Sequence, residues 1–310
     1  MNIAFIYEDN SNLRSLKDRI NQISLKLLRK VEVKDIINDN YKNIAINKII
    51  ICIPKYKYNK IDNKLMKNLI YVLKQNSIKN IVLSKELNQK KLLKNTIYSH
   101  NYNILDGRFL IKTSTIDILE YIMKNVDSNI NKEEISILVN ENSKINLDII
   151  TNIANNAKRV NIITNNIAKF KKLEKKLYEE KGIMISIGNN KKKGLSKSKY
   201  IVNMDFTEEL LNKYKIYKRA ILINIENICK INTKLFSGII INNIEIKYDN
   251  NIDLKDKFDR NETYETSIIA IDNLQHIDII KQKDNFKIVN TIGNNGIINQ
   301  NEYYFTKKLQ

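Results

Sequence analysis

The chain has 310 residues and a mass of 36.4 kDa, a length that favours two domains with cores large enough to fold without disulfides. One proline and seven glycines exclude collagen-like, proline-rich and glycine-linker architectures, and 43% hydrophobic with 28% charged residues is typical of a globular protein. The sequence contains neither a long apolar run nor an N-terminal signal pattern, so we expect a soluble, cytoplasmic protein with no membrane partner.

The formal net charge is +19, from 53 basic and 34 acidic residues. Such an excess favours phosphate-rich partners. However, only seven of the basic residues are arginine, and the abundance of Asn, Ile and Lys is typical of a low-GC bacterium, whose codons enrich lysine. We therefore expect no nucleic-acid partner and keep a polyanion or nucleic-acid binder as an alternative function. The dense run Lys191, Lys192 and Lys193 is its candidate anion-binding cluster.

The N-terminal part alternates short apolar runs with helical spacing. We predict a strand over Ile3 to Tyr7, a helix over Leu13 to Leu28, a strand over Lys48 to Ile53, a helix over Ile61 to Leu73 and a strand over Asn80 to Ser84. This alternation predicts a small α/β domain. The next helix, Thr113 to Asn125, begins with hydroxyl residues suited to capping and is expected to connect two domains.

The second half continues the alternation. Its predicted strands are Ile135 to Val139, Val160 to Thr164, Ile183 to Ile187, Lys199 to Met204 and Arg219 to Ile225. Its predicted helices are Leu147 to Ala157, Ile167 to Lys181 with Gly182 as C-cap, and Thr207 to Tyr214 with Thr207 as N-cap. Parallel strands with right-handed crossovers are the economical arrangement.

The C-terminal region has weaker signals. We predict a strand or hairpin over Phe236 to Lys247 and a helix over Glu262 to Ile280, and we expect the tail to be irregular. We therefore predict a two-domain α/β fold: an N-terminal α/β domain (1–112), the connecting helix (113–128), a larger Rossmann-like parallel sheet (129–250), and a C-terminal helix and tail that pack across the domains (251–310).

The order of a small α/β domain, a connecting helix and a strand–helix–strand unit resembles shikimate dehydrogenase and glutamyl-tRNA reductase-like proteins. The local match runs from Ile135 to Asn224. Asn165 lies where those families have the Asn of an Asn-Arg-Thr turn, whereas Asn166 replaces the Arg that meets the 2′-phosphate in NADP-dependent members. The strand that ends at Asn203 resembles their fourth strand, which lines the cofactor side. The resemblance implies a Rossmann-like fold with NAD or NADP as cofactor.

The first strand-to-helix turn departs from that pattern because it contains no glycine. A dinucleotide needs glycine there so that the backbone can approach the pyrophosphate. The turn instead contains the candidate cofactor-binding residues Asn140, Asn142, Ser143 and Lys144, with Glu141 among them. Asn165, Asn166 and Asn203 complete the candidate set. A like charge at about 4 Å costs roughly 4 kcal/mol at an effective dielectric constant near 20, which Lys144 offsets in part. We therefore expect no cofactor, with NAD or NADP as the alternative.

Other chemistry has few candidate residues. His100 and His276 are the only histidines, and neither has metal-ligand spacing, so we predict no metal site. Cys52 and Cys229 lie inside apolar runs and are expected to be buried thiols. Arg108 follows an Asp106-Gly107 turn. Two interpretations of Arg108 are open. It could bind an anion, with Asp106 orienting it or accepting a proton, or it could form a local ion pair beside an Asp-Gly turn.

Asp205 follows the strand that ends at Asn203, where open parallel sheets place ligand-contacting residues; helix capping is the alternative interpretation. The missing glycines and the few histidines favour a non-catalytic binding or regulatory protein with a small-molecule or protein partner. The alternative is a divergent NAD(P)-dependent dehydrogenase or reductase that uses an interdomain cleft with Arg108 and Asp205.

Overall fold

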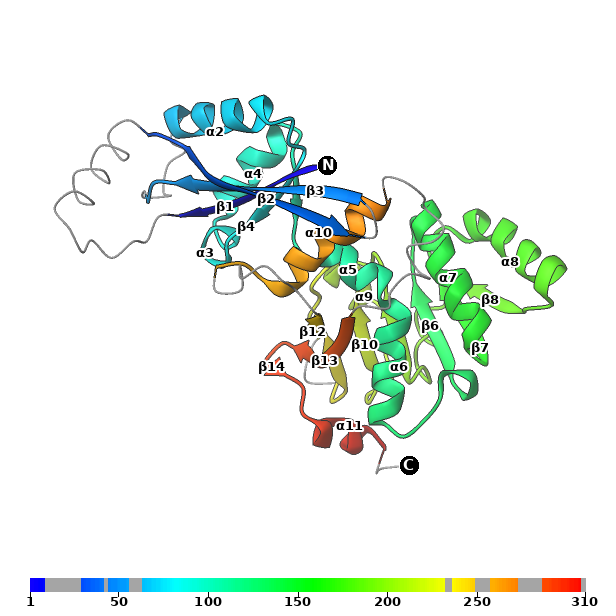
Figure 1. The fold of residues 1–310 in the computed structure, drawn as a ribbon. Coiled ribbons are helices and arrows are strands. Elements are labelled where there is room, and N and C mark those ends of the chain that lie inside the picture. Colours follow the sequence, from blue (N-terminus) through cyan, green and yellow to red (C-terminus); the bar gives the residue numbers. More distant parts are fainter. Residues whose placement is uncertain are drawn as a thin grey trace. The chain divides into compact units, whose positions relative to one another are not determined.

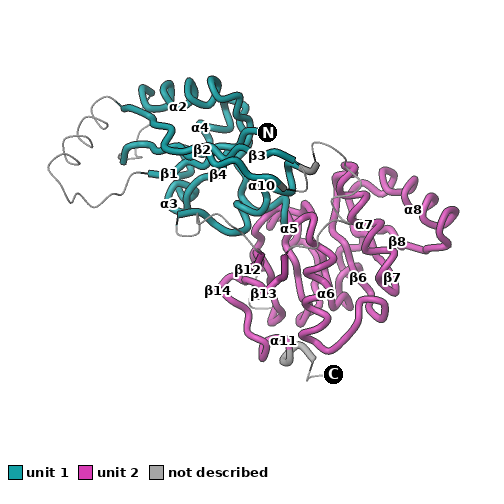
Figure 2. Tube along the Cα trace, viewed as in Figure 1, with its two compact units in different colours: residues 1–110, 250–283 teal, residues 111–249, 284–310 magenta. Residues whose placement is uncertain are grey.

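The structure is a computed structural model that describes residues 1–8, 29–41, 44–55, 63–231, 236–248, 257–272 and 286–307. The chain divides into two compact units (Figure 2). Unit 1 comprises residues 1–110 and 250–283, and unit 2 comprises residues 111–249 and 284–310. The region after residue 250 is thus shared between the two units. The predicted helix over Leu13 to Leu28 lies outside the described residues.

Unit 1 contains a five-stranded sheet with the order β2-β3-β1-β4-β5 (Figure 1). Its strands are β1 (Asn2–Glu8), β2 (Glu32–Tyr41), β3 (Ile44–Ile53), β4 (Asn80–Leu83) and β5 (Asn103–Leu105). β3, β1, β4 and β5 are parallel, whereas β2 pairs antiparallel with β3. β2 is an edge strand, and most of its side chains are exposed or half-buried. Its sequence, EVKDIINDNY, lacks the apolar run that marks the central strands.

Helices cover both faces of this sheet. One face packs against α2 (Asn63–Gln75), α3 (Lys85–Asn88) and α4 (Lys91–Ser99) through a core that includes Leu65, Leu69 and Leu73. The opposite face packs against α10 (Arg260–Asp272) and the residues before it: Phe258 meets Phe5 edge to face, with 5.2 Å between ring centroids. Figure 1 shows α2 and α10 on opposite sides of the sheet. The unit is therefore a three-layer α/β structure.

Unit 2 contains a six-stranded parallel sheet with the order β11-β10-β9-β6-β7-β8. Its strands are β6 (Glu134–Leu138), β7 (Arg159–Ile163), β8 (Ile185–Gly188), β9 (Tyr200–Asn203), β10 (Ile221–Asn224) and β11 (Ile239–Ile241). Numbered by appearance in the sheet, the order is 3-2-1-4-5-6, which is that of a Rossmann fold. The predicted two-domain α/β fold with a Rossmann-like parallel sheet is confirmed.

The helices of unit 2 follow the predicted alternation. They are α6 (Thr115–Asn125), α7 (Lys144–Asn156), α8 (Ile167–Lys181), α9 (Glu208–Leu211) and α11 (Gln300–Lys307), with a 3-10 turn η1 (Ile130–Lys132); α5 (Arg108–Thr113) spans the boundary between the units. Gly182 ends α8 with φ of 66°, and the Thr207 side chain accepts a hydrogen bond from the Leu210 amide at 3.3 Å. Both predicted caps are confirmed.

Two segments after β10 differ from prediction. The hairpin alternative for Phe236 to Lys247 is wrong, because β11 joins the parallel sheet while β12 (Asn243–Tyr248) joins a separate antiparallel sheet. That sheet also contains β13 (Phe286–Gly293) and β14 (Gly296–Ile297), so the described part of the tail, residues 286–307, has regular strands and a helix where we predicted an irregular segment. The buried hydroxyls of Thr291 and Tyr303 bond to each other at 2.5 Å and attach α11 to this sheet.

Both cysteines are buried thiols outside any disulfide, as predicted. Within the described residues, no helix is long and apolar enough to span a membrane.

Candidate functional site

The candidate site in unit 2 is the carboxyl edge of the parallel sheet, where β6 and β9 lie side by side. The chain proceeds from β6 toward β7 and β8 on one side, and from β9 toward β10 and β11 on the other. This reversal makes the β6–β9 pair the topological switch point, where open α/β sheets bind ligands. The loops that leave these two strands contain Asn140 and Glu141 after β6, and Asp205 after β9.

The Asp205 carboxylate bonds to the backbone amides that follow β6. The Asn140 amide donates to both Asp205 oxygens, at 2.8 and 2.9 Å, and the Glu141 amide donates to Oδ2 at 2.7 Å. In a Rossmann domain, backbone amides of this first turn face the pyrophosphate. Asp205 thus gives them an anionic acceptor from within the chain, and it does not cap α9, a role that Thr207 fills.

Burial raises the pKa of the Asp205 carboxyl. The two amide donors oppose this rise, and the neighbouring charges of Glu226 and Glu141 add to it. Glu226 is itself paired with Lys112, whose side chain is mostly buried. Three carboxylates therefore lie near the switch point, of which Glu226 is neutralised by Lys112, and a further anion placed there would be repelled by Asp205 and Glu141.

Asparagine side chains connect the loops on the β6, β7 and β8 side of the edge. Asn140 Oδ1 accepts from the Asn165 amide at 2.9 Å, and the Asn166 side-chain amide donates to the Asn140 carbonyl at 3.1 Å. The Asn189 side-chain amide, which follows β8, donates to Asn165 Oδ1 at 3.1 Å. Three of the predicted cofactor-binding residues, Asn140, Asn165 and Asn166, are thus hydrogen-bonded to one another.

A second row of asparagines runs along β9, β10 and β11. Asn203 and Asn224 are the last residues of their strands, and Asn242 directly follows β11. The Asn203 side-chain amide donates to Asn224 Oδ1 at 3.0 Å, Asn224 donates to Asn242 Oδ1 at 2.8 Å, and Asn242 donates to Asn294 Oδ1 at 2.7 Å. Asn203, Asn224 and Asn242 are buried, so the hydrogen bonds of the Asn203 side chain stabilise the fold.

The remaining candidates of this edge face solvent or lie inside. Asn142 and Lys144 are exposed. Ser143 occupies the N-cap position of α7 without capping through its side chain. The Ser143 hydroxyl and Asn146 Oδ1 are buried without a hydrogen-bond partner in the described residues, and ordered water commonly satisfies such groups.

The predicted anion-binding lysines lie on the turn between β8 and β9. Lys191, Lys192 and Lys193 are exposed, and the amides of Lys192 and Lys193 donate to Asn190 Oδ1 at 3.1 and 2.9 Å. Asn190 therefore shapes the turn, and the three ammonium groups project from an exposed loop. Their binding to a polyanion stays a prediction.

Unit 1 contains a buried carboxyl cluster, Glu262 and Glu265 on α10, that the sequence analysis missed. Both are more than nine-tenths buried, and each has an Oε2 atom without a hydrogen-bond partner in the described residues. The Asn88 side-chain amide donates to Glu262 Oε1. Glu265 accepts hydrogen bonds from the amides of Gly107, Phe109 and Leu110. The sequence gives little signal for this burial, because the segment RNETYETSIIAID is mostly polar around the two acids.

Burial is the main cause that raises the pKa of each of these carboxyls to about 8. The nearby charge of Asp106 contributes to both increases, while Lys94 opposes the increase at Glu262 and the three amides oppose it at Glu265. Both values lie above neutral pH, so we expect both side chains to be protonated there and the cluster to be a pair of neutral acids. No group of three or more His, Cys, Asp or Glu residues suited to a metal ion occurs among the described residues.

Arg108 lies beside this cluster at the start of α5. Burial lowers the pKa of its guanidinium, which the charges of Asp106 and Glu265 oppose. Asp106 Oδ1 accepts from the Arg108 amide at 3.2 Å, and Gly107 has φ of 79°. The Asp-Gly segment therefore forms a turn that places Arg108 near the acidic side chains of Asp106 and Glu265.

No family model matches the chain, and no curated protein matches it. Solved structures with similar folds include L-tryptophan dehydrogenase from Nostoc punctiforme (10% identity, TM-score 0.30, 75% of this chain and 64% of that one). Others are dipicolinate synthase A chain from Bacillus subtilis (10%, 0.33, 77% and 87%) and ornithine transcarbamoylase from Giardia lamblia (9%, 0.30, 72% and 72%).

The chain thus spans less than two thirds of the length of the tryptophan dehydrogenase. These identities and TM-scores support no inference about activity or ligands. The class that the strand order defines is a Rossmann-like α/β protein. The finer resemblance to shikimate dehydrogenase and glutamyl-tRNA reductase-like proteins stays a prediction.

Proposed function

We propose that the chain is a non-catalytic binding or regulatory protein whose Rossmann-like unit does not hold a dinucleotide. One observation supports this most strongly: the Asp205 carboxylate accepts hydrogen bonds from the Asn140 and Glu141 amides in the turn after β6. A pyrophosphate that used these donors would first have to displace Asp205. The displaced carboxylate would then lie near the pyrophosphate, with Glu141 and Glu226 close by.

The asparagine rows add a second argument. The side chains of Asn140, Asn166 and Asn203 form hydrogen bonds within the fold, and Asn203 is buried. A ligand that took these polar atoms as partners would have to break those bonds, and an unsatisfied side-chain amide at the buried Asn203 would cost about 1–3 kcal/mol. The loss of these bonds outweighs what a phosphate could gain from one exposed lysine, Lys144.

The expected result of titrating the full chain with NAD, NADH, NADP or NADPH is no saturable binding up to millimolar concentration. Isothermal titration calorimetry measures this directly. A Kd tighter than about 1 mM, which corresponds to about 4 kcal/mol of binding, would contradict the proposal. ADP-ribose, which keeps the pyrophosphate and lacks the nicotinamide, serves as a further probe: its binding would show that the turn after β6 accepts a pyrophosphate and would also contradict the proposal.

A further inference from the structure

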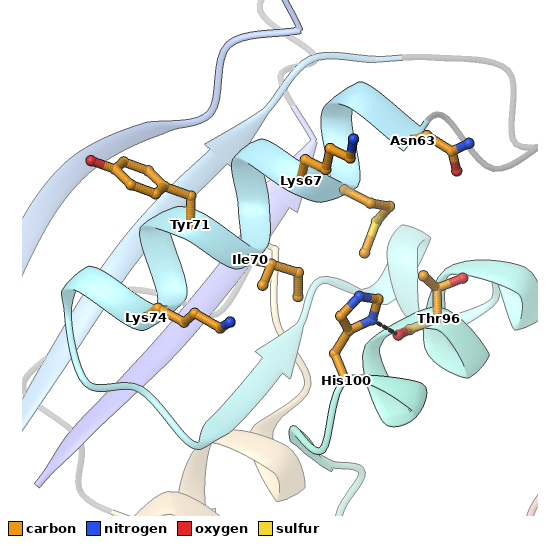
Figure 3. A pocket seen from close by; sticks show the side chains of 8 residues that line it. Asn63, Lys67, Ile70, Tyr71, Lys74, Thr96 and His100 are labelled. Atoms are coloured by element: carbon orange, nitrogen blue, oxygen red, sulfur yellow. Dashed lines mark hydrogen bonds between the residues drawn. The ribbon is translucent and has the colours of Figure 1, made fainter.

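A pocket of about 540 Å³ opens in unit 1 between α2 and the end of α4 (Figure 3). Its volume lies within the range of about 300–1,000 Å³ that small-molecule sites have in proteins. It is independent of the carboxyl edge of unit 2, because every residue that lines it belongs to unit 1. The lining residues are Asn63, Met66, Lys67, Ile70, Tyr71, Lys74, Thr96 and His100.

The floor of the pocket is apolar. Met66 and Ile70 are buried side chains of α2 and belong to the core that α2 shares with the sheet, so they are held in place by packing. Tyr71 adds a largely exposed aromatic ring at the edge, 62% accessible. An apolar body of a ligand would cover the part of these side chains that is still exposed in the pocket, which contributes about 25 cal/mol for each Å² removed from water.

The rim is cationic. Lys67 and Lys74 are seven residues apart on α2, two helical turns, and therefore lie on the same face of the helix. Figure 3 shows Lys74 extending from α2 toward the side where His100 lies. Both lysines are exposed, and none of the eight lining residues is acidic. No ion pair between either lysine and a carboxylate occurs in the described part of the chain.

His100 forms the opposite wall. It is the C-cap residue of α4, and its Nδ1 lies 2.8 Å from the Thr96 carbonyl oxygen. Because a carbonyl oxygen only accepts, Nδ1 carries the hydrogen of this bond, which fixes the ring orientation. The ring lies below Ile70 in Figure 3 and closes the pocket with Thr96.

From this combination we propose that the pocket binds an organic anion with an apolar body, the anionic group facing Lys67 and Lys74 and the body covering Met66 and Ile70. The two lysines favour a negatively charged ligand, since the lining contains no carboxylate that would repel an anion. The apolar floor selects against small inorganic anions, which cannot bury apolar surface. A carboxylate or a phosphate monoester attached to an apolar chain would supply such an anionic group.

The test is calorimetric titration of the full chain with octanoate and with octyl phosphate. We expect at least one of them to bind saturably with one site per chain, and the tighter of the two identifies the headgroup. Acetate, which lacks the body, and octylammonium, which reverses the charge, are expected to bind at least about tenfold more weakly. Absence of saturable binding by both octyl anions would overturn the proposal.

The variant Lys67→Glu/Lys74→Glu is expected to weaken octanoate or octyl phosphate binding at least about tenfold. Both sites are exposed, so folding is expected to persist, which the circular dichroism spectrum checks. Lys91→Glu, on the exposed start of α4 and outside the pocket, is the matched charge control and is expected to leave the Kd unchanged. Equal Kd values for the double variant and the native chain would also overturn the proposal.

Discussion

Unit 1 is expected to lose stability steadily as the pH rises from about 5 to about 8, on account of Glu262 and Glu265. The pKa of each carboxyl is raised from 4.5 to about 8 in the folded state. In this interval the folded state therefore binds more protons than the unfolded state. The stabilising contribution is complete below pH 4.5 and is lost as the pH passes the folded value. The loss is on the order of 3–5 kcal/mol for each group.

Glutamine has the size of a protonated glutamic acid and does not ionise, so E262Q/E265Q is expected to remove most of this pH dependence. Urea unfolding at several pH values, with the first-unit transition followed separately, measures it. The double variant is expected to equal the native chain near pH 5 and to exceed its stability near pH 8. Glu86→Gln, at an exposed position of the same unit, is the control. Identical slopes for the native chain and the double variant would show that these carboxyls do not hold protons at neutral pH.

Replacement of Asp205 is the second large effect. Asp205→Ala leaves the amides of Asn140 and Glu141 without the acceptor that they share, and the free energy of unfolding is expected to fall by about 2–3 kcal/mol. Asp205→Asn keeps one acceptor oxygen but turns an NH₂ group toward a donor, so an intermediate loss of about 1–2 kcal/mol is expected. Burial of the charged Asp205 carboxylate, which raises its pKa, costs free energy in the native chain. Both substitutions remove this cost, which offsets part of each loss of stability.

Glu209→Ala is the control for these variants. Glu209 lies four residues further on α9 and makes an exposed ion pair with Lys213 at 3.1 Å, so its removal is expected to cost at most about 0.5 kcal/mol. Thermal or urea unfolding of unit 2 measures all three variants. A loss no larger for Asp205→Ala than for Glu209→Ala would show that the carboxylate does not hold the switch-point amides.

The strands that the sequence predicted well are those buried on both faces. Residues such as Ile135, Ile162 and Ile201 form continuous apolar runs because helices cover both sides of the sheet, and such runs are visible without tertiary information. β2 was missed for the opposite reason. It is held by its backbone pairing with β3, which no local pattern of polar residues reveals.

The polar contacts of the site were less predictable. Asp205 and Asn140 are 65 residues apart and meet only because β9 lies beside β6. The asparagine row depends in the same way on neighbouring strands that end at one level, as Asn203 and Asn224 do in register. In retrospect the strand-ending motifs YIVN and ILIN were a usable signal. The protons on Glu262 and Glu265 depend on burial, which requires the packed structure.

The proposed function requires that Asp205, and not a ligand, accept the hydrogen bonds of the Asn140 and Glu141 amides at the switch point. A crystal structure of the native chain grown with millimolar NADH tests it most directly. We predict Asp205 oxygens within hydrogen-bond distance of the Asn140 and Glu141 amides, and no pyrophosphate density against them. A pyrophosphate bound to these two amides, with the Asp205 side chain turned away, would contradict the account.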